Sequence, residues 1–314
     1  MNALFDRETT VHALLSALPY IRMFRGKVFV VKAGGTMCGD SGALEDLATQ
    51  LSVLRELGIR VVLVHGGGPQ TTELGTRLGL TTTQIDGRRV TDAATLDVSV
   101  MTLNGSVRTA LLAACRAAQL PAVGLSGIDA GLVRATRRSV QNLDVGGART
   151  TVDFGLVGDI DTVDPTALLA LLDAGLMPVV SPLCADDSGQ VLNVNADTVA
   201  SSLALALDAE KLIFLTDTQG VLERVSDPRS LVSYTDVAGL DRMASSGALG
   251  AGMLPKAKAA REALLGGVRR VHLVGYKSKT SVLVEVFTNE GSGTMVVRDE
   301  AELTQGPPAA GGGR

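Results

Sequence analysis

The residues best suited to chemistry follow the ends of apolar segments, and they favour the binding of anions. Residues Lys27–Gly35 (KVFVVKAGG) are an apolar run that ends in two glycines, with Lys32 just before the turn. Residues Arg60–Gln70 (RVVLVHGGGPQ) repeat this pattern and end in three glycines and a proline. Short apolar runs bounded by glycine are typical of buried parallel strands. Glycine turns leave backbone N–H groups uncovered, and a helix that begins there adds partial positive charge.

The two glycine turns carry more weight together than either does alone. By itself, the three-glycine run is better explained by a tight turn that needs glycine for its backbone dihedrals. Neighbouring parallel strands, however, end at one edge of the sheet, where ligands of open α/β sheets bind. We therefore predict a site for a phosphate or carboxylate between Gly34–Gly35 and Gly66–Gly68.

Residues 84–92, which we predict to form a strand or a hairpin, carry Arg88 and Arg89 side by side. One member of such a pair is commonly solvated. If one points inward beside the glycine turns, its guanidinium can clamp a carboxylate with two hydrogen bonds.

A polar segment at residues 193–197 (NVNAD) precedes a predicted helix rich in Ala and Leu. Asn195 is explained as a simple helix N-cap. That explanation does not cover Asn193 and Asp197, which are four residues apart and can bring an amide and a carboxylate to the mouth of the site.

Two further segments carry residues that suit a ribose, a phosphate or another anion. A polar turn follows the apolar run at residues 211–215 and contains Thr216, Asp217, Gly220 and Val221. This turn either contacts a ribose or phosphate or is only a turn. Lys256 lies near the start of a predicted helix at residues 252–265, where the helix dipole disfavours a cation. It is either exposed to solvent or placed there to meet an anionic ligand.

The elements that must position these residues alternate between apolar strands and helices, which predicts an α/β fold with parallel strands. The predicted strands are residues 27–33, 60–65, 121–125, 176–182, 211–215, 271–274 and 293–297, with hairpins between 132 and 163. An amphipathic helix at residues 8–25 must bury its apolar stripe on its own domain or on a partner subunit. We predict an N-terminal helix (1–26), two lobes (27–184 and 185–298) and a disordered tail (299–314).

The composition argues against several classes of function. The 314 residues are 46% hydrophobic and 20% charged, as in globular proteins with a large core. A net charge of −4 without a Lys/Arg block argues against nucleic-acid binding. The three cysteines and three histidines lack metal-ligand or disulfide spacing, so we predict no protein metal site and a reducing compartment. Without an uninterrupted run of about 18 apolar residues or a signal-peptide core, we predict a cytoplasmic protein that binds no membrane.

In combination, the motifs resemble those of the acetylglutamate kinase family, within the amino-acid kinase superfamily, from about Leu18 to Val297. Several motifs in one order are far more specific than any single motif. The matching segments are Val31–Gly35, His65–Pro69, Gly87–Asp92, Asn193–Asp197, Thr216–Asp217 with Gly220–Val221, and Gly252–Lys256.

The resemblance implies a three-layer αβα sandwich with a mainly parallel central sheet. It implies phosphoryl transfer from ATP, with Mg²⁺, to the side-chain carboxylate of N-acetyl-L-glutamate in arginine biosynthesis. In this family the residues matching Lys32 and Lys256 neutralise charge on the transferring group, and the one matching Asp197 orients both lysines. The other implied roles are substrate binding by Gly67, Gly68, Arg89 and Asn193, and nucleotide binding by Gly34, Gly35, Thr216, Asp217, Gly220 and Val221.

The implied chemistry is physically coherent, because two anionic substrates need positive charge and accurate placement more than covalent help. A carboxylate nucleophile is already ionised at neutral pH, so no general base is required. The motifs accordingly include no catalytic histidine.

Some residues depart from the family pattern on the substrate side. Ala33 stands where the family usually has a bulkier residue, and Thr36 stands where it usually has Asn. Residues 104–109 (NGSVRT) replace the usual Gly-Gly-x-Val-Asn-Lys. Alternative substrates are therefore N-succinylglutamate or an aminoadipate on a carrier protein. A non-catalytic amino-acid-binding regulator is the alternative outside enzymes, although retention of both lysines argues against it. The kinase-like domain of an acetylglutamate synthase is disfavoured, because the chain leaves no room for an acetyltransferase domain.

Regulation is a separate question. Residues Leu18–Arg22 resemble the N-terminal helix of arginine-inhibited members, in which such helices interlace dimers into a hexamer. Glu285 with Glu290–Thr294 resembles the far end of their effector site, whereas Gly275-Tyr276 and Thr280 replace the usual Asp-Gly and His. We expect a homohexamer or homodimer, with arginine as a candidate effector.

Overall fold

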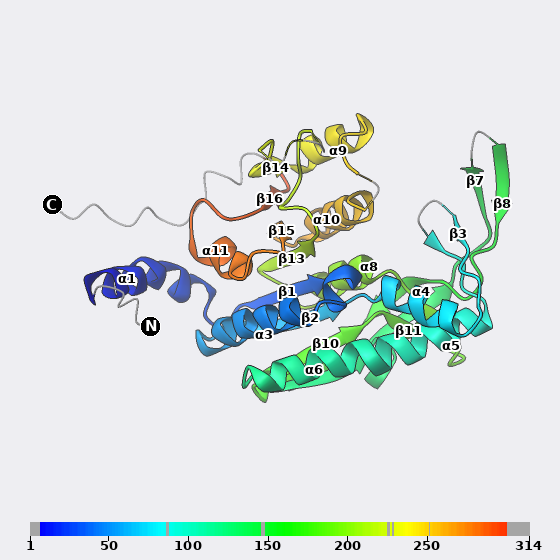
Figure 1. Ribbon diagram of the computed structural model, residues 1–314, viewed down its shortest axis with the longest axis horizontal. Coiled ribbons are helices and arrows are strands. Elements are labelled where there is room, and N and C mark those ends of the chain that lie inside the picture. Colours follow the sequence, from blue (N-terminus) through cyan, green and yellow to red (C-terminus); the bar gives the residue numbers. More distant parts are fainter. Residues whose placement is uncertain are drawn as a thin grey trace.

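The fold is built around a large, mainly parallel sheet. The computed structural model describes residues 7–85, 88–145, 148–224, 227, 229–250 and 252–299. Eight strands lie in the order β14-β16-β15-β13-β1-β2-β10-β5, and only the β15–β16 pair among them is antiparallel (Figure 1). They are β1 (Val28–Ala33), β2 (Arg60–His65), β5 (Ala122–Ser126), β10 (Met177–Ser181), β13 (Lys211–Thr216), β14 (Tyr234–Asp236), β15 (Arg270–Gly275) and β16 (Thr294–Val297).

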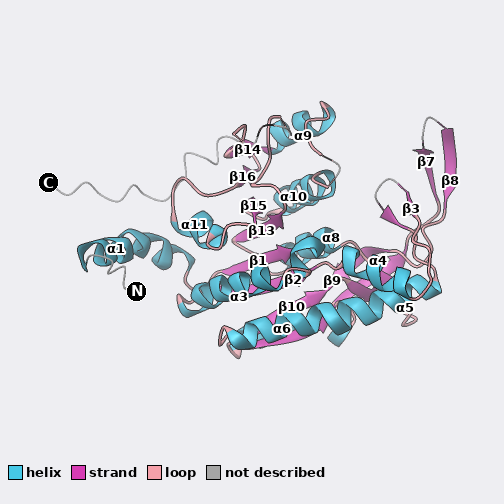
Figure 2. Ribbon diagram, in the orientation of Figure 1, coloured by secondary structure: helices cyan, strands magenta, loops and turns pink. Residues whose placement is uncertain are grey.

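Helices cover both faces of this sheet, so its central strands are buried throughout and need continuous apolar runs. Successive residues of β1 point to opposite faces, with Val30 in one core cluster and Phe29 and Val31 in the other. The first face carries α7 (Thr166–Asp173), α8 (Ala196–Ala206) and α10 (Leu254–Gly266), and the second carries α3 (Ser41–Glu56), α6 (Arg108–Ala117) and α11 (Ser281–Phe287) (Figure 2). The predicted three-layer αβα sandwich is confirmed.

Smaller sheets and hairpins extend one end of the molecule. A four-stranded sheet has the order β12-β11-β6-β9 and consists of β6 (Val133–Arg137), β9 (Gly158–Val163), β11 (Leu183–Ala185) and β12 (Val191–Asn193). Two antiparallel hairpins pair β3 (Gln84–Ile85) with β4 (Arg88–Arg89), and β7 (Gln141–Val145) with β8 (Ala148–Val152). The sequence predicted a strand or a hairpin in the first region and hairpins in the second. Gly87 of the family motif and the predicted tail from 300 onward lie outside the described residues.

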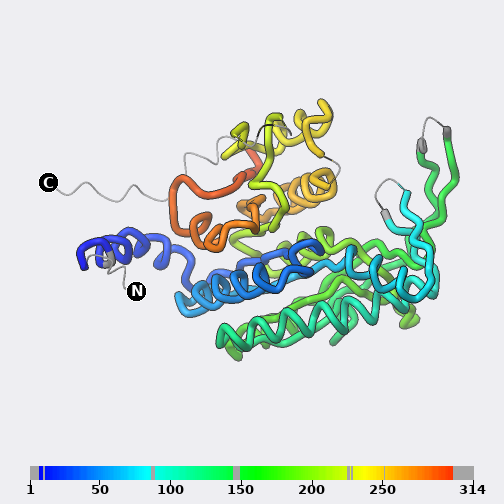
Figure 3. Tube along the Cα trace, viewed as in Figure 1, coloured from blue at the N-terminus to red at the C-terminus, as the bar shows by residue number. Residues whose placement is uncertain are grey.

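The predicted N-terminal helix is present as α1 (Arg7–Phe24), and it projects from the body at the end opposite the hairpins (Figure 3). Its last residue, Phe24, is buried and meets the Phe29 ring edge to face. The apolar side chains of its first turns are left uncovered: Val11, Leu14 and Leu15 are 55, 65 and 62% exposed.

Sequence patterns missed some elements. Helix α5 (Ala93–Val100) passes through a π-helical stretch (Met101–Val107) into α6, and no sequence pattern indicated the π-helical stretch. The short helix α2 (Gly35–Cys38), which begins at the first glycine turn, was not predicted. Strand β14 and helix α9 (Val237–Ser245) were not predicted, although Asp236 caps α9 by accepting a hydrogen bond from Gly239 N.

One continuous helix in the described part of the chain, residues 93–117, is long and apolar enough to cross a membrane by those criteria alone. Within its most apolar window, 44% of the residues are buried inside the protein. Core helices pass the same test, and α6 packs against α3 and β5. The segment is therefore weak support for a membrane span.

Candidate active site

The two glycine turns meet at the carboxyl edge of the large sheet. Strands β1 and β2 are paired so that Ala33 lies beside His65, and each strand runs directly into its glycines. The approach is close: a Cβ added to Gly35 would lie 2.6 Å from Pro69 Cδ and 3.0 Å from Gly68 N. Only a residue without a side chain fits there, so the structure brings the two predicted turns together.

The second turn is also a helix start. Helix α4 (Gly68–Arg77) has Gly67 at its N-cap and Pro69 in its first turn, and no side chain caps it. The N–H groups of the first turn of a helix have no partner within the helix and favour an anion. The proline fits because its missing N–H belongs to this unpaired set.

Lys32, Asp197 and Lys256 converge beside these turns from three different elements. Lys32 ends its side chain 2.7 Å from Asp197 Oδ1, and Lys256 Nζ lies 3.6 Å from Asp197 Oδ2. Lys32 comes from β1, Asp197 from the first turn of α8, and Lys256 from the first turn of α10. Asn195 positions Asp197 as the N-cap of α8, so the simple interpretation of Asn195 is confirmed.

The electrostatics of this trio favour an incoming anion. Burial works to raise the pKa of Asp197, but the ammonium groups of Lys32 and Lys256 outweigh it and hold that pKa below its usual value. Burial and the neighbouring Lys32 lower the pKa of Lys256, while Asp197 opposes them. Two ammonium groups thus share one carboxylate, which leaves one positive charge in excess.

Arg89 of β4 lies over the start of α4. Its guanidinium donates hydrogen bonds to Gly68 O at 3.0 Å and to Thr72 Oγ1 at 2.6 Å. Asn193, at the end of β12, donates from Nδ2 to Thr91 Oγ1 at 3.3 Å. Thr91 is fully buried and was missed as a site residue, although it lies only two positions after Arg89 in the sequence.

The turn after β13 lines a pocket together with Lys256. Asp217 contributes its carboxylate to this pocket, and Leu222, Leu249 and Met253 form an apolar wall. Sequence reasoning missed these apolar residues; the available signal was the run of apolar residues and glycines that leads into α10. A pocket with one apolar wall and one charged wall suits a nucleotide base at one end and phosphates at the other.

Other predicted nucleotide residues line this pocket but are partly engaged within the protein. The Thr216 hydroxyl donates to Thr218 O, and Val221 N donates to Thr294 Oγ1. A Cβ on Gly220 would lie 2.6 Å from Thr294 Oγ1, so close packing explains this glycine. Thr216, Gly220 and Val221 therefore shape the pocket mainly through backbone and packing. Gly34 lies outside the residues that line this pocket, beside the end of β13, where a Cβ would be 3.6 Å from Leu215 O.

Comparisons with known proteins agree with this geometry. The pattern of the "Amino acid kinase family" matches residues 27–275. An acetylglutamate kinase of Myxococcus xanthus is 48% identical over 94% of this chain and 96% of its own length. One of Beutenbergia cavernae is 45% identical over 95% of this chain and 96% of its own length.

The chain belongs to the amino acid kinase family.

Solved structures place it within the same fold. An N-acetylglutamate synthase from Neisseria gonorrhoeae has a TM-score of 0.79 and 29% identity, covering 92% of this chain and 63% of that chain. A carbamate kinase from Giardia has a TM-score of 0.63 and 16% identity, covering 87% of this chain and 99% of that chain. At that identity, the second likeness shows the fold alone.

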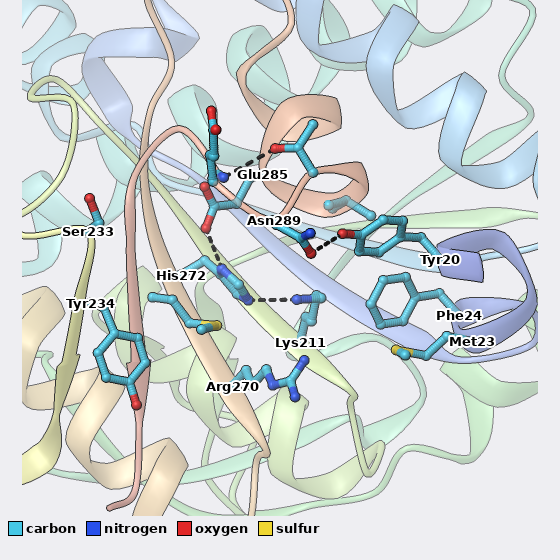
Figure 4. A pocket seen from close by; sticks show the side chains of 15 residues that line it. Tyr20, Met23, Phe24, Lys211, Ser233, Tyr234, Arg270, His272, Glu285 and Asn289 are labelled. Atoms are coloured by element: carbon cyan, nitrogen blue, oxygen red, sulfur yellow. Dashed lines mark hydrogen bonds and ion pairs between the residues drawn. The ribbon is translucent and has the colours of Figure 1, made fainter. Parts of the chain in front are cut away.

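This amino acid kinase family member has a second cavity at the amino-terminal ends of β13 and β15, where α1 meets the body (Figure 4). Lys211, His272 and Glu285 form a buried chain: Lys211 Nζ lies 2.8 Å from His272 Nε2, and His272 Nδ1 lies 2.6 Å from Glu285 Oε1. The Lys211 ammonium also lies 5.1 Å from the centre of the Phe24 ring. The Tyr20 hydroxyl of α1 donates to Asn289 and closes the cavity on one side.

The charge state of this cavity is unusual. Burial is the main cause that lowers the pKa of Lys211 to about 7, with Arg270 acting in the same direction. Burial also lowers the pKa of His272, so its ring is neutral near pH 7. Burial works to raise the pKa of Glu285, but hydrogen bonds from His272 and from Ser292 N and Gly293 N bring it below its usual value. The cavity thus presents an ionised carboxylate beside a lysine that loses its charge easily.

Proposed function

We propose that this protein phosphorylates the side-chain carboxylate of N-acetyl-L-glutamate with ATP, giving N-acetyl-L-glutamyl 5-phosphate in arginine biosynthesis. The observation that carries the proposal is the single buried Asp197 shared by Lys32 and Lys256 at the edge where two glycine turns meet. The relatives named acetylglutamate kinase support the choice of acceptor.

In this proposal Lys32 and Lys256 approach the transferring phosphoryl group from opposite sides and neutralise its charge. Asp197 orients both lysine side chains. The excess positive charge of the trio offsets the repulsion between two anionic substrates. The acceptor carboxylate is already ionised at neutral pH and attacks without a general base.

The substrate is held on the side of the α4 helix start. We propose that Gly67 and Gly68 offer backbone N–H groups to the acceptor, that Arg89 binds its main-chain carboxylate, and that Asn193 binds its amide. Arg89 is already oriented by Gly68 and Thr72, so little side-chain freedom is lost on binding. The lobe of residues 27–184 would then carry most of the acceptor site, and that of 185–298 the nucleotide site.

ATP use follows from membership of the kinase family. We propose that Gly34 and Gly35 hold the phosphates and that Thr216, Asp217, Gly220 and Val221 line the nucleotide pocket. Mg²⁺ fits as an ion carried by the nucleotide, because the described residues contain no group of three or more His, Cys, Asp or Glu side chains that could hold a metal. Bound to phosphate oxygens, Mg²⁺ neutralises part of the charge that develops during transfer.

The direct test is ADP release with Mg-ATP, in the presence of hydroxylamine to trap an acyl phosphate. The acceptors compared are N-acetyl-L-glutamate, N-succinyl-L-glutamate and free glutamate. We expect turnover with the acetyl compound alone. Turnover with the succinyl compound instead would reassign the acyl group, and no turnover with any acceptor would favour a carrier-bound aminoadipate or a non-catalytic role.

We also propose L-arginine as an effector that binds the second cavity. An ionised Glu285 offers a partner for a guanidinium, and Tyr20 of α1 closes over the same space. A solved structure of the synthase from Neisseria gonorrhoeae is described as a complex with L-arginine, with a TM-score of 0.78 and 30% identity to this chain. The test is inhibition of turnover by L-arginine and its loss in Glu285→Gln.

We propose a cytoplasmic homo-oligomer. The uncovered apolar face of α1 suits pairing with α1 of another copy, which would join dimers into a hexamer. A homodimer is the alternative, and light scattering separates the two.

A further inference from the structure

His65 is a buried polar side chain that the proposed mechanism does not use. It is the last residue of β2, follows the apolar run Val61–Val64 and is fully buried. Its Nε2 atom has no hydrogen-bond partner in the part of the chain that the structure describes. A polar atom that is buried without a partner lowers stability, so an apolar side chain would fill this position better. The ring therefore needs an explanation other than packing.

The other nitrogen of the ring fixes its protonation state. His65 Nδ1 lies 3.0 Å from Gly66 O. Because a carbonyl oxygen only accepts hydrogen bonds, Nδ1 carries the proton and donates it. Burial is the main cause that lowers the pKa of His65 to about 4; the bond to Gly66 opposes burial, and the charges of Arg108 and Lys32 add to it. The ring is therefore neutral near pH 7, and its one proton is on Nδ1.

The bond to Gly66 O sets the orientation of the peptide between Gly66 and Gly67. This peptide is trans and planar, so its C=O and N–H groups point in opposite directions. Since Gly66 O is turned toward the buried ring, Gly67 N–H is turned away from it. Gly66 N donates to Ala33 O at 3.0 Å and ties the preceding peptide to β1. Glycine backbones are otherwise free to adopt many dihedrals, so these two bonds restrict the start of the second glycine turn.

Gly67 N and Gly68 N lie close to the first glycine turn. A Cβ built on Gly35 would be 3.3 Å from Gly67 N and 3.0 Å from Gly68 N. Neither nitrogen donates a hydrogen bond to any other residue in the described ranges. Two adjacent N–H groups without partners at a helix start favour an anionic oxygen. The orientation of the Gly66–Gly67 peptide therefore decides whether one of these two donors is available.

We propose that His65 is a positioning residue of the acceptor site, whose Nδ1–H holds the Gly66–Gly67 peptide so that Gly67 N–H is directed at an anionic oxygen of the acceptor. His65 touches no substrate in this proposal and transfers no proton. The inference deepens the proposed function and rests on it in one respect, because it requires that the second glycine turn binds the acceptor.

A purely structural role for His65 is the competing explanation, and three variants separate the two. His65→Asn keeps an N–H donor near the place of Nδ1. His65→Gln is its matched control, because the same amide on a side chain one methylene longer lies near the place of Nε2 and away from Gly66 O. His65→Leu removes the donor and the unpaired nitrogen and keeps a branched side chain in the core.

The experiment is steady-state kinetics with Mg-ATP and N-acetyl-L-glutamate, together with Tm and calorimetric Mg-ADP binding, on the full chain. We expect His65→Leu and His65→Gln to lower kcat/KM for the acceptor about tenfold to hundredfold, the loss for one hydrogen bond to a charged group. His65→Asn should retain most of the wild-type value. The KM for ATP and the affinity for Mg-ADP should stay unchanged in all three variants.

Stability should follow a different order from activity. A buried amide leaves its oxygen without a partner, whereas leucine buries no polar atom, so the Tm of His65→Leu should exceed that of His65→Asn. A structural role predicts that activity follows Tm, but the proposal predicts that the less stable variant is the more active one. Equal losses of kcat/KM in His65→Asn and His65→Gln, activity that follows Tm, or loss of Mg-ADP binding in all three variants would overturn the proposal.

Failure of this inference is distinguishable from failure of the proposed function. If the wild type turns over N-acetyl-L-glutamate and the variants do not follow the expected order, only the role of His65 is wrong. If the wild type turns over N-succinyl-L-glutamate or free glutamate instead, the proposed acceptor is wrong, and the same variants test His65 with that acceptor. A wild type that turns over none of these acceptors overturns both.

Discussion

At the scale of single residues, the site depends on one buried carboxylate that two lysines share. Asp197 is 5% exposed, so either lysine alone would leave it less well neutralised in a medium of low dielectric. Each lysine is thus held in place by the structure before any substrate arrives. Such preorganisation is the main source of electrostatic catalysis.

We expect Lys32→Met and Lys256→Met each to lower kcat by about 10²- to 10³-fold, because the lost charge acts on the transition state. The Tm should stay within a few degrees, since the other lysine still pairs with Asp197. Lys258→Met is the matched control: its side chain is 69% exposed on the same helix, and it should retain kcat. Near-full kcat in either site variant would contradict the assigned role.

The buried Lys211 makes a prediction about stability and pH. Its pKa is about 7 in the folded protein against 10.5 for the free side chain, so between these values the unfolded chain binds more protons. Stability should therefore rise with pH from about 7 to 10 through this group. At about 1.4 kcal/mol per pKa unit, the penalty below pH 7 is on the order of a few kcal/mol.

Lys211→Met removes that penalty. We expect the variant to exceed the wild type in Tm at pH 6.5 and the difference to shrink as the pH approaches 9, measured by thermal denaturation. Lys27→Met, which changes an exposed lysine next to the same sheet, should leave the pH dependence as it is. A constant difference across this range would show that Lys211 keeps an ordinary pKa.

At the scale of elements, the anion site is created by strands β1 and β2 and by the starts of helices α2 and α4. The glycines between them permit backbones to approach to distances that any side chain would prevent. The β1–β2 register sets which glycines face each other, because Ala33 and His65 are paired.

We expect Gly35→Ala to lower kcat/KM by at least an order of magnitude and to destabilise the fold by about 1–3 kcal/mol through overpacking. The new Cβ would meet Pro69 and the backbone of Gly68, and it would push α4 away from the glycine turn that follows β1. Kinetics and urea denaturation measure both effects. Gly75→Ala, on helix α4 itself, would bring its Cβ no closer than 4.0 Å to any neighbour and should preserve activity and stability. Full activity in Gly35→Ala would mean that the two turns have room to separate.

At the scale of the whole molecule, α1 is attached to the body only near its end, and its first turns present apolar side chains to solvent. A long amphipathic helix without a partner of its own is typical of an interface between copies. The second cavity lies where this helix joins the body, so assembly and effector binding would act on the same element.

We expect the double variant Leu14→Glu and Leu15→Glu to convert a hexamer into dimers while leaving the Tm nearly unchanged, because both side chains are more than 60% exposed in the single chain. Multi-angle light scattering measures the change. Val140→Glu, which alters an exposed apolar residue elsewhere, is the control. If the wild-type protein is already a dimer, the proposed hexamer is wrong.

The sequence alone determined the features that local pattern controls. The strands around Lys32, His65 and Lys211 were predicted because buried parallel strands need continuous apolar runs, and the cap at Asn195 because N-caps have a local chemistry. The family motifs pointed to Lys32, Asp197 and Lys256. Their positions in the sequence, however, do not give the distances between these side chains in the folded protein.

Tertiary structure decided what depends on strand order and packing. The pairing of β13 and β2 on either side of β1, and the packing of α8 and α10 on one face, bring together lysines that are more than two hundred positions apart in the sequence. The same folding buried Lys211 beside His272 and joined Tyr276 N to Thr216 O by a backbone hydrogen bond. Such contacts arise from side chains on separate elements, so no local pattern in the sequence could have specified them.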